Sequence, residues 1–186
     1  MLQTSAVESH TLALLEQLLE LEQLRHFNLV GGTALALRFG HRKSIDLDLF
    51  SFEPVDIPAL REVLKVRFGD SFREEGKELK FGLFCFINEV KVDFVRYPHQ
   101  LVRPVERIGF VRMASVEDIA AMKIKAILGR GNKKDFFDLV ELIDKISLGK
   151  LFNYTQKSIR TIRFSFPSPA PLPGSMMPKI LRILLA

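Results

Sequence analysis

The chain has 186 residues, of which 47% are hydrophobic, so it is long and apolar enough for one domain with a sizeable core. Its one cysteine, Cys85, excludes an internal disulfide, and no apolar run approaches the roughly 18 residues that a membrane-spanning helix needs. The first residues lack the basic and apolar regions of a signal peptide, so a cytoplasmic location is expected. A net charge of +5 favours anionic partners only weakly.

The first elements expected are a helix, a strand and a second helix. Leucines recur at helical spacing over about residues 5–25, which predicts an amphipathic helix. Residues 27–30 are a short apolar run that is typical of a buried strand. A second helix is expected from Thr33 until Gly40 ends it.

Gly31 and Gly32 lie between that strand and that helix. Glycine lets the backbone approach a ligand closely, and a helix that begins at Thr33 would direct its free N–H groups toward a phosphate. The three residues therefore indicate a phosphate-binding turn, although paired glycines before a helix are also common as ordinary turns.

Three aspartates are the candidate metal ligands. Asp46 and Asp48 share one face of a predicted strand because residues two apart on a strand point the same way. They alternate with Ile45, Leu47 and Leu49, which are expected to face the core. Asp93 has the same alternation within residues 90–94. Adjacent carboxylates repel one another without a cation, and Mg²⁺ prefers oxygen ligands, so the three predict a magnesium site.

A helix and a hairpin are expected next. Asp56 and Pro58 are typical of a helix start, and that helix would continue to about residue 68. Residues 79–95 predict a hairpin that turns at Asn88, which would place Asp93 beside the Asp46 strand. Cys85 lies within the apolar part of this hairpin and is expected to be a buried structural thiol.

Two further helices are predicted in the C-terminal half. Ser115 and Asp118 resemble a capping box for a helix that reaches about residue 128, and the next helix would span roughly 133–146. On that helix Asp138 shares a face with Asp135 and with Lys134, and the simplest interpretation is a surface ion pair.

The last segment has a different composition. Prolines at 167, 169, 171 and 173 exclude a helix or a central strand, so an extended tail is expected. The apolar residues 180–186 would dock on the domain or pair with a second chain. We therefore expect one domain over residues 1–150 and an atypical Pro-rich tail over 151–186.

Four motifs, in this order, resemble those of the nucleotidyltransferase AbiEii/AbiGii toxin family. They are Gly31-Gly32-Thr33-Ala34-Leu35, residues 41–50, Lys91-Val92-Asp93, and residues 118–123 continued by 133–139. The resemblance covers about residues 25–145. It implies an α+β fold with a polymerase-β-like nucleotidyltransferase core, a small mixed sheet flanked by helices over about 25–100, and a helical C-terminal part over about 115–147.

The resemblance also implies an activity: transfer of a nucleoside monophosphate from an NTP to an acceptor hydroxyl, by the toxin of a bacterial toxin–antitoxin pair that acts on tRNA and has a cognate antitoxin protein. Asp46 and Asp48 would hold two Mg²⁺ ions on the triphosphate. Asp93 would bind the second ion and accept the hydroxyl proton. Lys123 would contact phosphate, and Asp135 would orient Lys123 or the acceptor.

Five more residues complete the expected nucleotide site. Gly31, Gly32 and Thr33 would cradle the β and γ phosphates, while Arg42 and Ser44 would either contact phosphate or fix the entrance to the strand. Lys and Arg residues over 96–134 would form a tRNA or triphosphate surface, or simply solvated faces. Two alternatives remain open: a catalytically inactive nucleotide- or RNA-binding module, and a transferase acting on a small molecule such as an aminoglycoside antibiotic.

Overall fold

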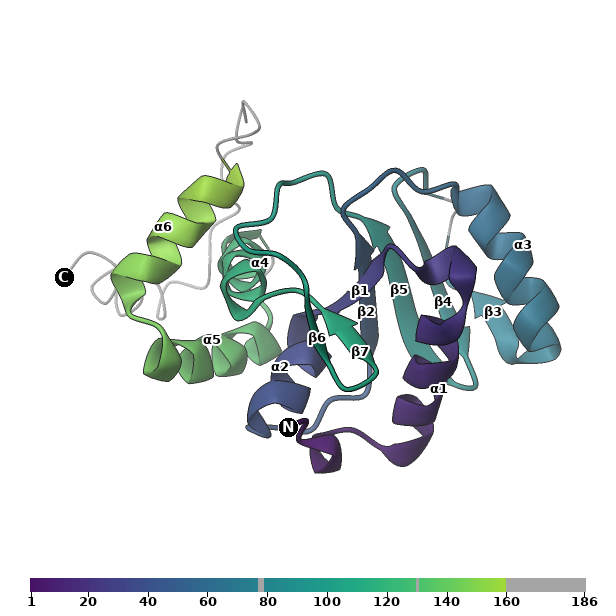
Figure 1. Ribbon diagram of the computed structural model, residues 1–186, viewed down its shortest axis with the longest axis horizontal. Coiled ribbons are helices and arrows are strands. Elements are labelled where there is room, and N and C mark those ends of the chain that lie inside the picture. Colours follow the sequence, from purple (N-terminus) through teal and green to yellow (C-terminus); the bar gives the residue numbers. More distant parts are fainter. Residues whose placement is uncertain (77–78, 130, 160–186) are drawn as a thin grey trace.

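A computed structural model describes residues 1–76, 79–129 and 131–159 and shows a mixed α+β fold (Figure 1). One seven-stranded sheet has the order β3-β4-β5-β2-β1-β7-β6. Its strands are β1 (Phe27–Val30), β2 (Leu47–Ser51), β3 (Phe72–Glu74), β4 (Gly82–Ile87), β5 (Val90–Arg96), β6 (Glu106–Ile108) and β7 (Val111–Met113). The pairs β2–β5 and β1–β7 are parallel and the other neighbours antiparallel, so the predicted small mixed sheet is confirmed.

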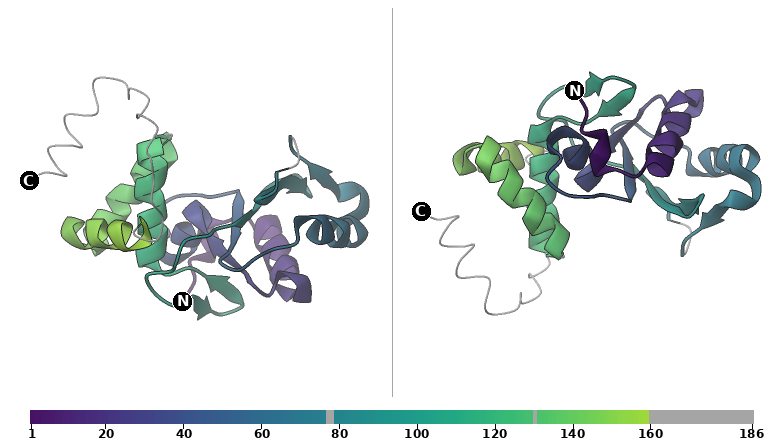
Figure 2. Two further views of the ribbon diagram at one scale, coloured as in Figure 1. Left: turned by 90° about the horizontal axis from the view of Figure 1, so that it is seen from above. Right: turned by 90° about the horizontal axis from the view of Figure 1, so that it is seen from below.

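Six α-helices surround the sheet within the described ranges. They are α1 (Ser9–Glu20), α2 (Gly31–Phe39), α3 (Ile57–Phe68), α4 (Val116–Gly129), α5 (Lys133–Lys145) and α6 (Leu148–Ile159). Both views in Figure 2 show α4, α5 and α6 grouped at one end of the molecule and α3 at the opposite end. No helix of the described residues is long and apolar enough to cross a membrane.

The central strands bury one face and leave the other partly open. Leu47 and Leu49 of β2 and Val92 and Phe94 of β5 are fully buried, together with leucines of α1 and α3. The ring of Phe94 packs edge-to-face on Phe27 at 5.5 Å. Burial of each such apolar side chain contributes about 1.5–3 kcal/mol to the stability of the fold, so packing on this face stabilises the domain. The alternating residues of both strands lie on the opposite face, where the functional side chains are found.

Most predicted elements are confirmed, but the first helix is interrupted. The expected helix over 5–25 consists of a 3-10 turn at Thr4–Ala6, then α1, then a second 3-10 turn at Glu22–Leu24. Glu8 and Leu21 have extended backbone angles, so α1 ends at both positions. Leu24, which follows the second interruption, is fully buried. Ile45 is also 54% exposed rather than in the core, because it precedes β2 and lies outside the strand's alternation.

The hairpin of β4 and β5 turns as predicted. Asn88 and Glu89 have φ of 50° and 62°, the left-handed conformation that a two-residue hairpin turn requires. Cys85 is fully buried in β4, and burial raises the pKa of its thiol to about 12, which confirms a structural role.

Helix α4 is capped by Ser115, whose Oγ accepts a hydrogen bond from the Asp118 N–H at 3.1 Å. The Asp118 carboxylate differs from the capping-box expectation, because it accepts the backbone N–H groups of Val102 and Arg103 at 2.6 and 3.1 Å. Asp118 therefore ties the segment after β5 to the start of α4.

Helix α6 continues the helical part across residue 150, where the tail was expected to begin. Leu151 and Thr155 are buried on it. The proline-rich residues and the final apolar residues lie outside the described part of the chain, so the division at residue 150 and the extended tail stay predictions.

Candidate active site

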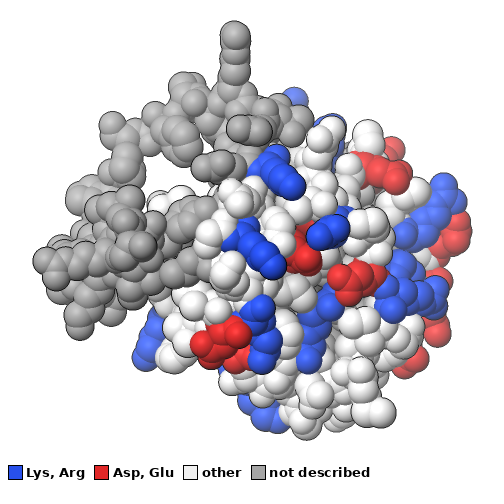
Figure 3. All heavy atoms as spheres, turned by 60° about the vertical axis from the view of Figure 1, so that its left-hand side comes forward, with Lys and Arg blue, Asp and Glu red and all other residues white. Residues whose placement is uncertain are grey.

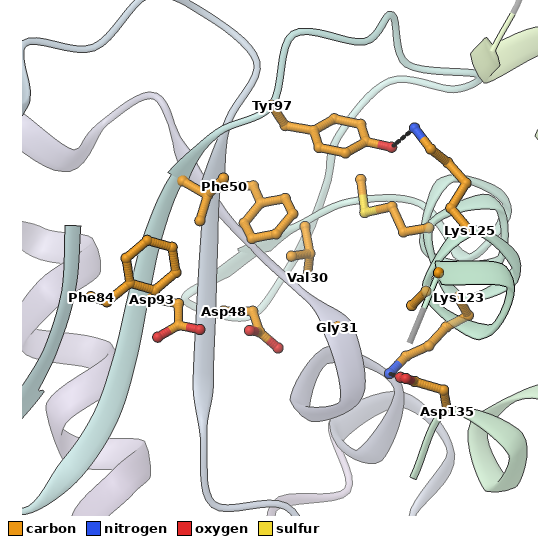
Figure 4. Close-up of a pocket in the computed structure, with 14 residues that line it drawn as sticks. Val30, Gly31, Asp48, Phe50, Phe84, Asp93, Tyr97, Lys123, Lys125 and Asp135 are labelled. Carbon is orange, nitrogen blue, oxygen red and sulfur yellow. Dashed lines mark hydrogen bonds and ion pairs between the residues drawn. The ribbon is translucent and has the colours of Figure 1, made fainter. Parts of the chain in front are cut away.

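Asp48 and Asp93 lie side by side at the centre of the sheet. Strands β2 and β5 are parallel neighbours in a register that makes Asp48 the direct partner of Asp93. Figure 4 shows both carboxylates on the same side of the two strands, facing a cavity, with Lys123 and Asp135 across from them. The predicted convergence of two strands therefore occurs for these two aspartates.

The electrostatics of this pair suit a cation. The Asp93 side chain is 21% exposed, and burial together with the negative charge of Asp48 raises its pKa to about 6. Its Oδ1 is buried and accepts no hydrogen bond from the described residues, with the Lys91 ammonium 3.9 Å away. A buried carboxylate oxygen without a donor, beside a second carboxylate, provides the hard oxygen ligands that Mg²⁺ takes.

Asp46, the third expected ligand, lines the same cavity but has a different contact. It precedes β2, and its Oδ2 lies 3.2 Å from the Lys134 ammonium of α5. Among the described residues, no three Asp, Glu, His or Cys side chains are grouped to hold a metal ion. Asp48 and Asp93 thus fit a metal as they stand, and Asp46 would join them only after a change of contact.

The two glycines give room to the polar side chains around them. Gly31 has φ of +69° at the start of α2, and a Cβ there would lie 2.1 Å from Oδ2 of Asp48. A Cβ at Gly32 would lie 2.0 Å from Nη2 of Arg42. Only glycine allows α2 to begin this close to the carboxylate and the guanidinium.

Thr33 and Ser44 connect the segment that precedes β2 to the first turn of α2. Their buried hydroxyls are 2.8 Å apart, and the Thr33 hydroxyl also donates to the carbonyl of Asp46. Both hydroxyls are therefore used within the protein. Of the two roles expected for Ser44, this geometry fits the one that fixes the strand entrance.

Asp138 is the centre of a buried ion cluster that the sequence did not reveal. Its carboxylate is fully buried and receives the His41 ring at 2.8 Å, Arg42 at 2.7 and 3.0 Å, and the Lys123 ammonium at 2.7 Å. Burial alone would raise the pKa of Asp138, but hydrogen bonds from Arg42 and Lys123 lower it to about 2. The alternative of a surface ion pair between Asp138 and Lys134 is excluded, because Asp138 is buried and binds these three side chains instead.

Lys123 is held between two carboxylates of α5. Its ammonium lies 2.9 Å from Oδ1 of Asp135 as well as against Asp138, and its side chain is 9% exposed. Asp135 is thus placed to orient Lys123, as expected. The spacing of Asp135 and Asp138 on one helix face was the available signal for the cluster, since both had to face the same neighbour.

The cavity has two connected parts, each of about 390 Å³, that share Asp48, Asp93, Lys123 and Asp135. One part is largely apolar and is shown in Figure 4. Its wall includes Phe50, Phe84, Val95, Tyr97 and Met122. The other part is polar, and its lining includes Arg42, Asp46, Lys91, Lys133 and Lys134. The carboxylate pair lies where the two parts meet.

The end of the apolar part is an aromatic and basic cluster. Tyr97 stacks on Phe50 with ring centres 5.6 Å apart, and its hydroxyl accepts from the Lys125 ammonium at 3.3 Å (Figure 4). Lys125 also lies 2.7 Å from Nε2 of His99. Burial lowers the pKa of Lys125, and burial with the charge of Lys125 lowers the pKa of His99. The sequence contained no periodic signal for this cluster.

The basic residues noted in the sequence have different roles. Arg112 donates to the carbonyls of Leu19 and Leu24, so it supports the fold. Lys123, Lys125 and Lys134 line the cavity instead. On the coloured part of the face in Figure 3, positive and negative side chains are interspersed, so that face carries no single block of positive charge.

Comparisons with known proteins give a family match and a sequence relative for this chain. The family model described as nucleotidyl transferase AbiEii toxin, type IV TA system, matches residues 13–163. An uncharacterized protein of Aquifex aeolicus (strain VF5), aq_aa25, is 34% identical over 158 residues, which are 81% of this chain and 75% of that protein.

Solved nucleotidyltransferase structures have the same fold. The antibiotic-resistance factor ANT(2″)-Ia superposes with a TM-score of 0.62 at 18% identity, over 82% of this chain and 92% of that one. The Megavirus polyadenylate synthase superposes with a TM-score of 0.52 at 12% identity, over 94% of this chain and 36% of that one. These likenesses show that the chain shares its fold with both proteins.

Proposed function

This chain belongs to the nucleotidyl transferase AbiEii toxin family, and we propose that it transfers a nucleoside monophosphate from an NTP to an acceptor hydroxyl. The observation that carries the proposal is the pair of Asp48 and Asp93, with the unbonded buried oxygen of Asp93, beside the turn at Gly31. Family membership supports nucleotidyl transfer as the type of reaction.

Asp48 and Asp93 would hold Mg²⁺, with Asp46 as the third ligand. The metal would supply charge neutralisation at the phosphate oxygens. The N-terminus of α2 lies beside these carboxylates, and the polar part of the cavity brings Lys91, Lys123 and Lys134 around the same space. That arrangement supports placing the triphosphate in the polar part.

The apolar part would then take the nucleoside. Phe50 is two residues beyond Asp48 on the same face of β2, and Tyr97, which follows the end of β5, lines the same apolar part. Aromatic side chains at this distance from the reaction centre suit a nucleobase, which stacks on such surfaces.

The chemical step needs one proton acceptor. The acceptor oxygen attacks the α-phosphorus, the bond from the α-phosphorus to the bridging oxygen breaks, and pyrophosphate leaves with that oxygen. The Asp93 carboxylate, beside Asp48 at the centre of the site, would take the hydroxyl proton. Lys123, oriented by Asp135 and Asp138, would balance the charge that develops on the phosphate.

The acceptor is best described as a polyanion such as tRNA. Ammonium groups of Lys91, Lys133 and Lys134 line the polar part of the cavity, and the whole chain carries a net charge of +5. Positive clefts attract phosphate backbones and disfavour polycations. The same lining contains Asp46, Asp48, Asp93 and Asp135, so an aminoglycoside acceptor is the alternative that the labelled-acceptor experiment tests.

Incubation with each labelled NTP, Mg²⁺ and total tRNA tests the proposal. Label should enter tRNA with wild-type protein and with the exposed-site control Asp70→Asn, and should be lost with Asp48→Asn. Label in added tobramycin but not in tRNA would favour the antibiotic-type transferase. Nucleotide binding without transfer in the wild type would favour the inactive module.

The toxin role has its own test. We propose that a cognate antitoxin protein restrains this chain in the cytoplasm, because the family is described as the toxin of a type IV system. Induced expression should arrest bacterial growth, and Asp48→Asn should abolish the arrest. Relief by a neighbouring gene would identify the antitoxin, whereas normal growth at high expression would contradict this role.

A further inference from the structure

Lys134 forms an ion pair with Asp46, the third expected metal ligand. It extends from the first turn of α5 across the polar part of the cavity, and its ammonium lies 3.2 Å from Oδ2 of Asp46. The two side chains are 66% and 40% exposed, so the contact is a solvated ion pair that can open without disturbing the core.

Buried contacts hold the helix that carries Lys134 in place, whereas the Lys134 side chain itself is exposed. Asp135 and Asp138 on the same helix are buried and bind Lys123, and Asp138 also binds Arg42. Helix α5 is therefore anchored on the inner side of its first two turns. The four-carbon stem of Lys134 can still redirect its ammonium by several ångströms within the polar part of the cavity.

Asp46 differs from Asp48 and Asp93 both in its place along the chain and in its partner. Asp48 faces Asp93 directly across two strands, whereas Asp46 precedes β2 and gives its carboxylate to an ammonium. An ammonium beside Asp46 does for that carboxylate what a metal ion would do, since both neutralise it. One carboxylate oxygen cannot serve both at short range without mutual repulsion of the two cations.

We propose that Lys134 exchanges partners during the catalytic cycle: it neutralises Asp46 in the metal-free protein, and it binds the triphosphate, and the leaving pyrophosphate, once Asp46 ligates Mg²⁺. The inference rests on the proposed function, because it assumes that metal and phosphates share the polar part of the cavity. It assigns Lys134 as a phosphate-binding residue whose contact is coupled to assembly of the metal site.

If the exchange occurs, replacing Lys134 should change the affinities for Mg²⁺ and for pyrophosphate in opposite directions. Lys134→Met removes the competitor for Asp46, so the Mg²⁺ affinity of the nucleotide-free protein should rise by about 1.4- to 5-fold, the effect expected of an exposed ion pair. The same substitution removes an ammonium–phosphate contact, so the affinity for inorganic pyrophosphate in saturating Mg²⁺ should fall by about tenfold. A residue needed only for folding would shift both affinities downward together.

Isothermal titration of the full chain with MgCl₂, and then with pyrophosphate, measures both quantities. Lys133→Met is the matched control, because Lys133 lines the same cavity but its ammonium lies over the Phe137 ring at 5.7 Å instead of at Asp46. Only Lys134→Met should tighten Mg²⁺ binding. In a second arm without Mg²⁺, Asp46→Asn should strengthen pyrophosphate binding by about 1.4- to 5-fold, because Lys134 is then free to turn.

Failure of the exchange and failure of the proposed function give different results. If Asp93→Asn loses Mg²⁺ binding while Lys134→Met matches the wild type for both ligands, the exchange is wrong and the metal site stands. Tighter Mg²⁺ binding with unchanged pyrophosphate binding also overturns the exchange. If Asp93→Asn binds Mg²⁺ as the wild type does, the proposed metal site itself is wrong.

Discussion

Asp93→Asn should stabilise the metal-free protein while it abolishes nucleotidyl transfer. Because its pKa is raised, Asp93 binds its proton more tightly in the folded protein than in the unfolded chain. Ionisation of Asp93 therefore lowers the free energy of unfolding as the pH rises from about 4 to about 6. The rise of the Asp93 pKa from its ordinary value of 3.8 to about 6 corresponds to about 3 kcal/mol. Asparagine has the same shape, cannot ionise, and removes the repulsion with Asp48.

The expected gain at pH 7.5 is smaller than this limit, because the Asp93 side chain is 21% exposed and water screens part of its charge. We expect about 2 kcal/mol, which is about 4–8 °C in Tm for a chain of this size. Thermal unfolding followed by circular dichroism in EDTA measures it, with Asp70→Asn as the exposed control.

The Tm gain of Asp93→Asn should depend on pH and on Mg²⁺ in a way that only loss of the Asp93 charge explains. The gain should shrink as the pH falls from 6 to 4, because wild-type Asp93 is then protonated in the folded protein. Added Mg²⁺ should raise the Tm of the wild type and leave that of Asp93→Asn unchanged. An unchanged or lower Tm for Asp93→Asn at pH 7.5 would show that the carboxylate pair is not strained and would refute the electrostatic argument.

Further predictions concern Cys85, Asp138 and Gly31. Cys85 should resist iodoacetamide at pH 8 in the folded protein and react fully in urea, because burial raises its thiol pKa to about 12; rapid alkylation of the native chain would contradict its burial. Asp138→Asn should lower the free energy of unfolding by about 3–5 kcal/mol in urea titrations, since it leaves buried cations without their partner, and a loss under 1 kcal/mol would show that the cluster does not support the fold. Because the pKa of Asp138 is lowered to about 2, the stability it gives should be complete above about pH 4 and should be lost toward pH 2. Gly31→Ala should abolish transfer, because its Cβ would lie 2.1 Å from Asp48 Oδ2, whereas Gly149→Ala, which has open space around it, should keep full activity in the labelled-NTP assay; an active Gly31→Ala would refute the need for glycine.

The strand side of the site could be predicted from the sequence because it depends on a local period. Alternation of polar and apolar residues predicts that Asp48 and Asp93 each face away from the apolar side of their strand, and the turn at Asn88 predicts the hairpin of β4 and β5. Ile45 shows the limit of this reasoning, since the alternation begins only where the hydrogen-bonded strand does.

The helical side could be predicted only in part. Helices α4 and α5 are visible as periodic patterns, but the burial of Asp138 depends on His41 and Arg42, which are nearly a hundred residues away in the chain. No local pattern distinguishes a carboxylate that will meet three cations from one that will face water. Strands β6 and β7 were missed for a different reason: three residues are too few to show a period.

The two outermost strands of the sheet limit how another protein can attach to this one. Strands β3 and β6 have three residues each and carry the exposed Arg73 and Arg107, so neither presents a long apolar backbone edge for a further strand. Strand addition is therefore a poor route to inhibition. On the described part of the chain, the surfaces left for a protein inhibitor are the helices and the mouth of the cavity at Asp48 and Asp93, where it would compete with the proposed nucleotide or acceptor.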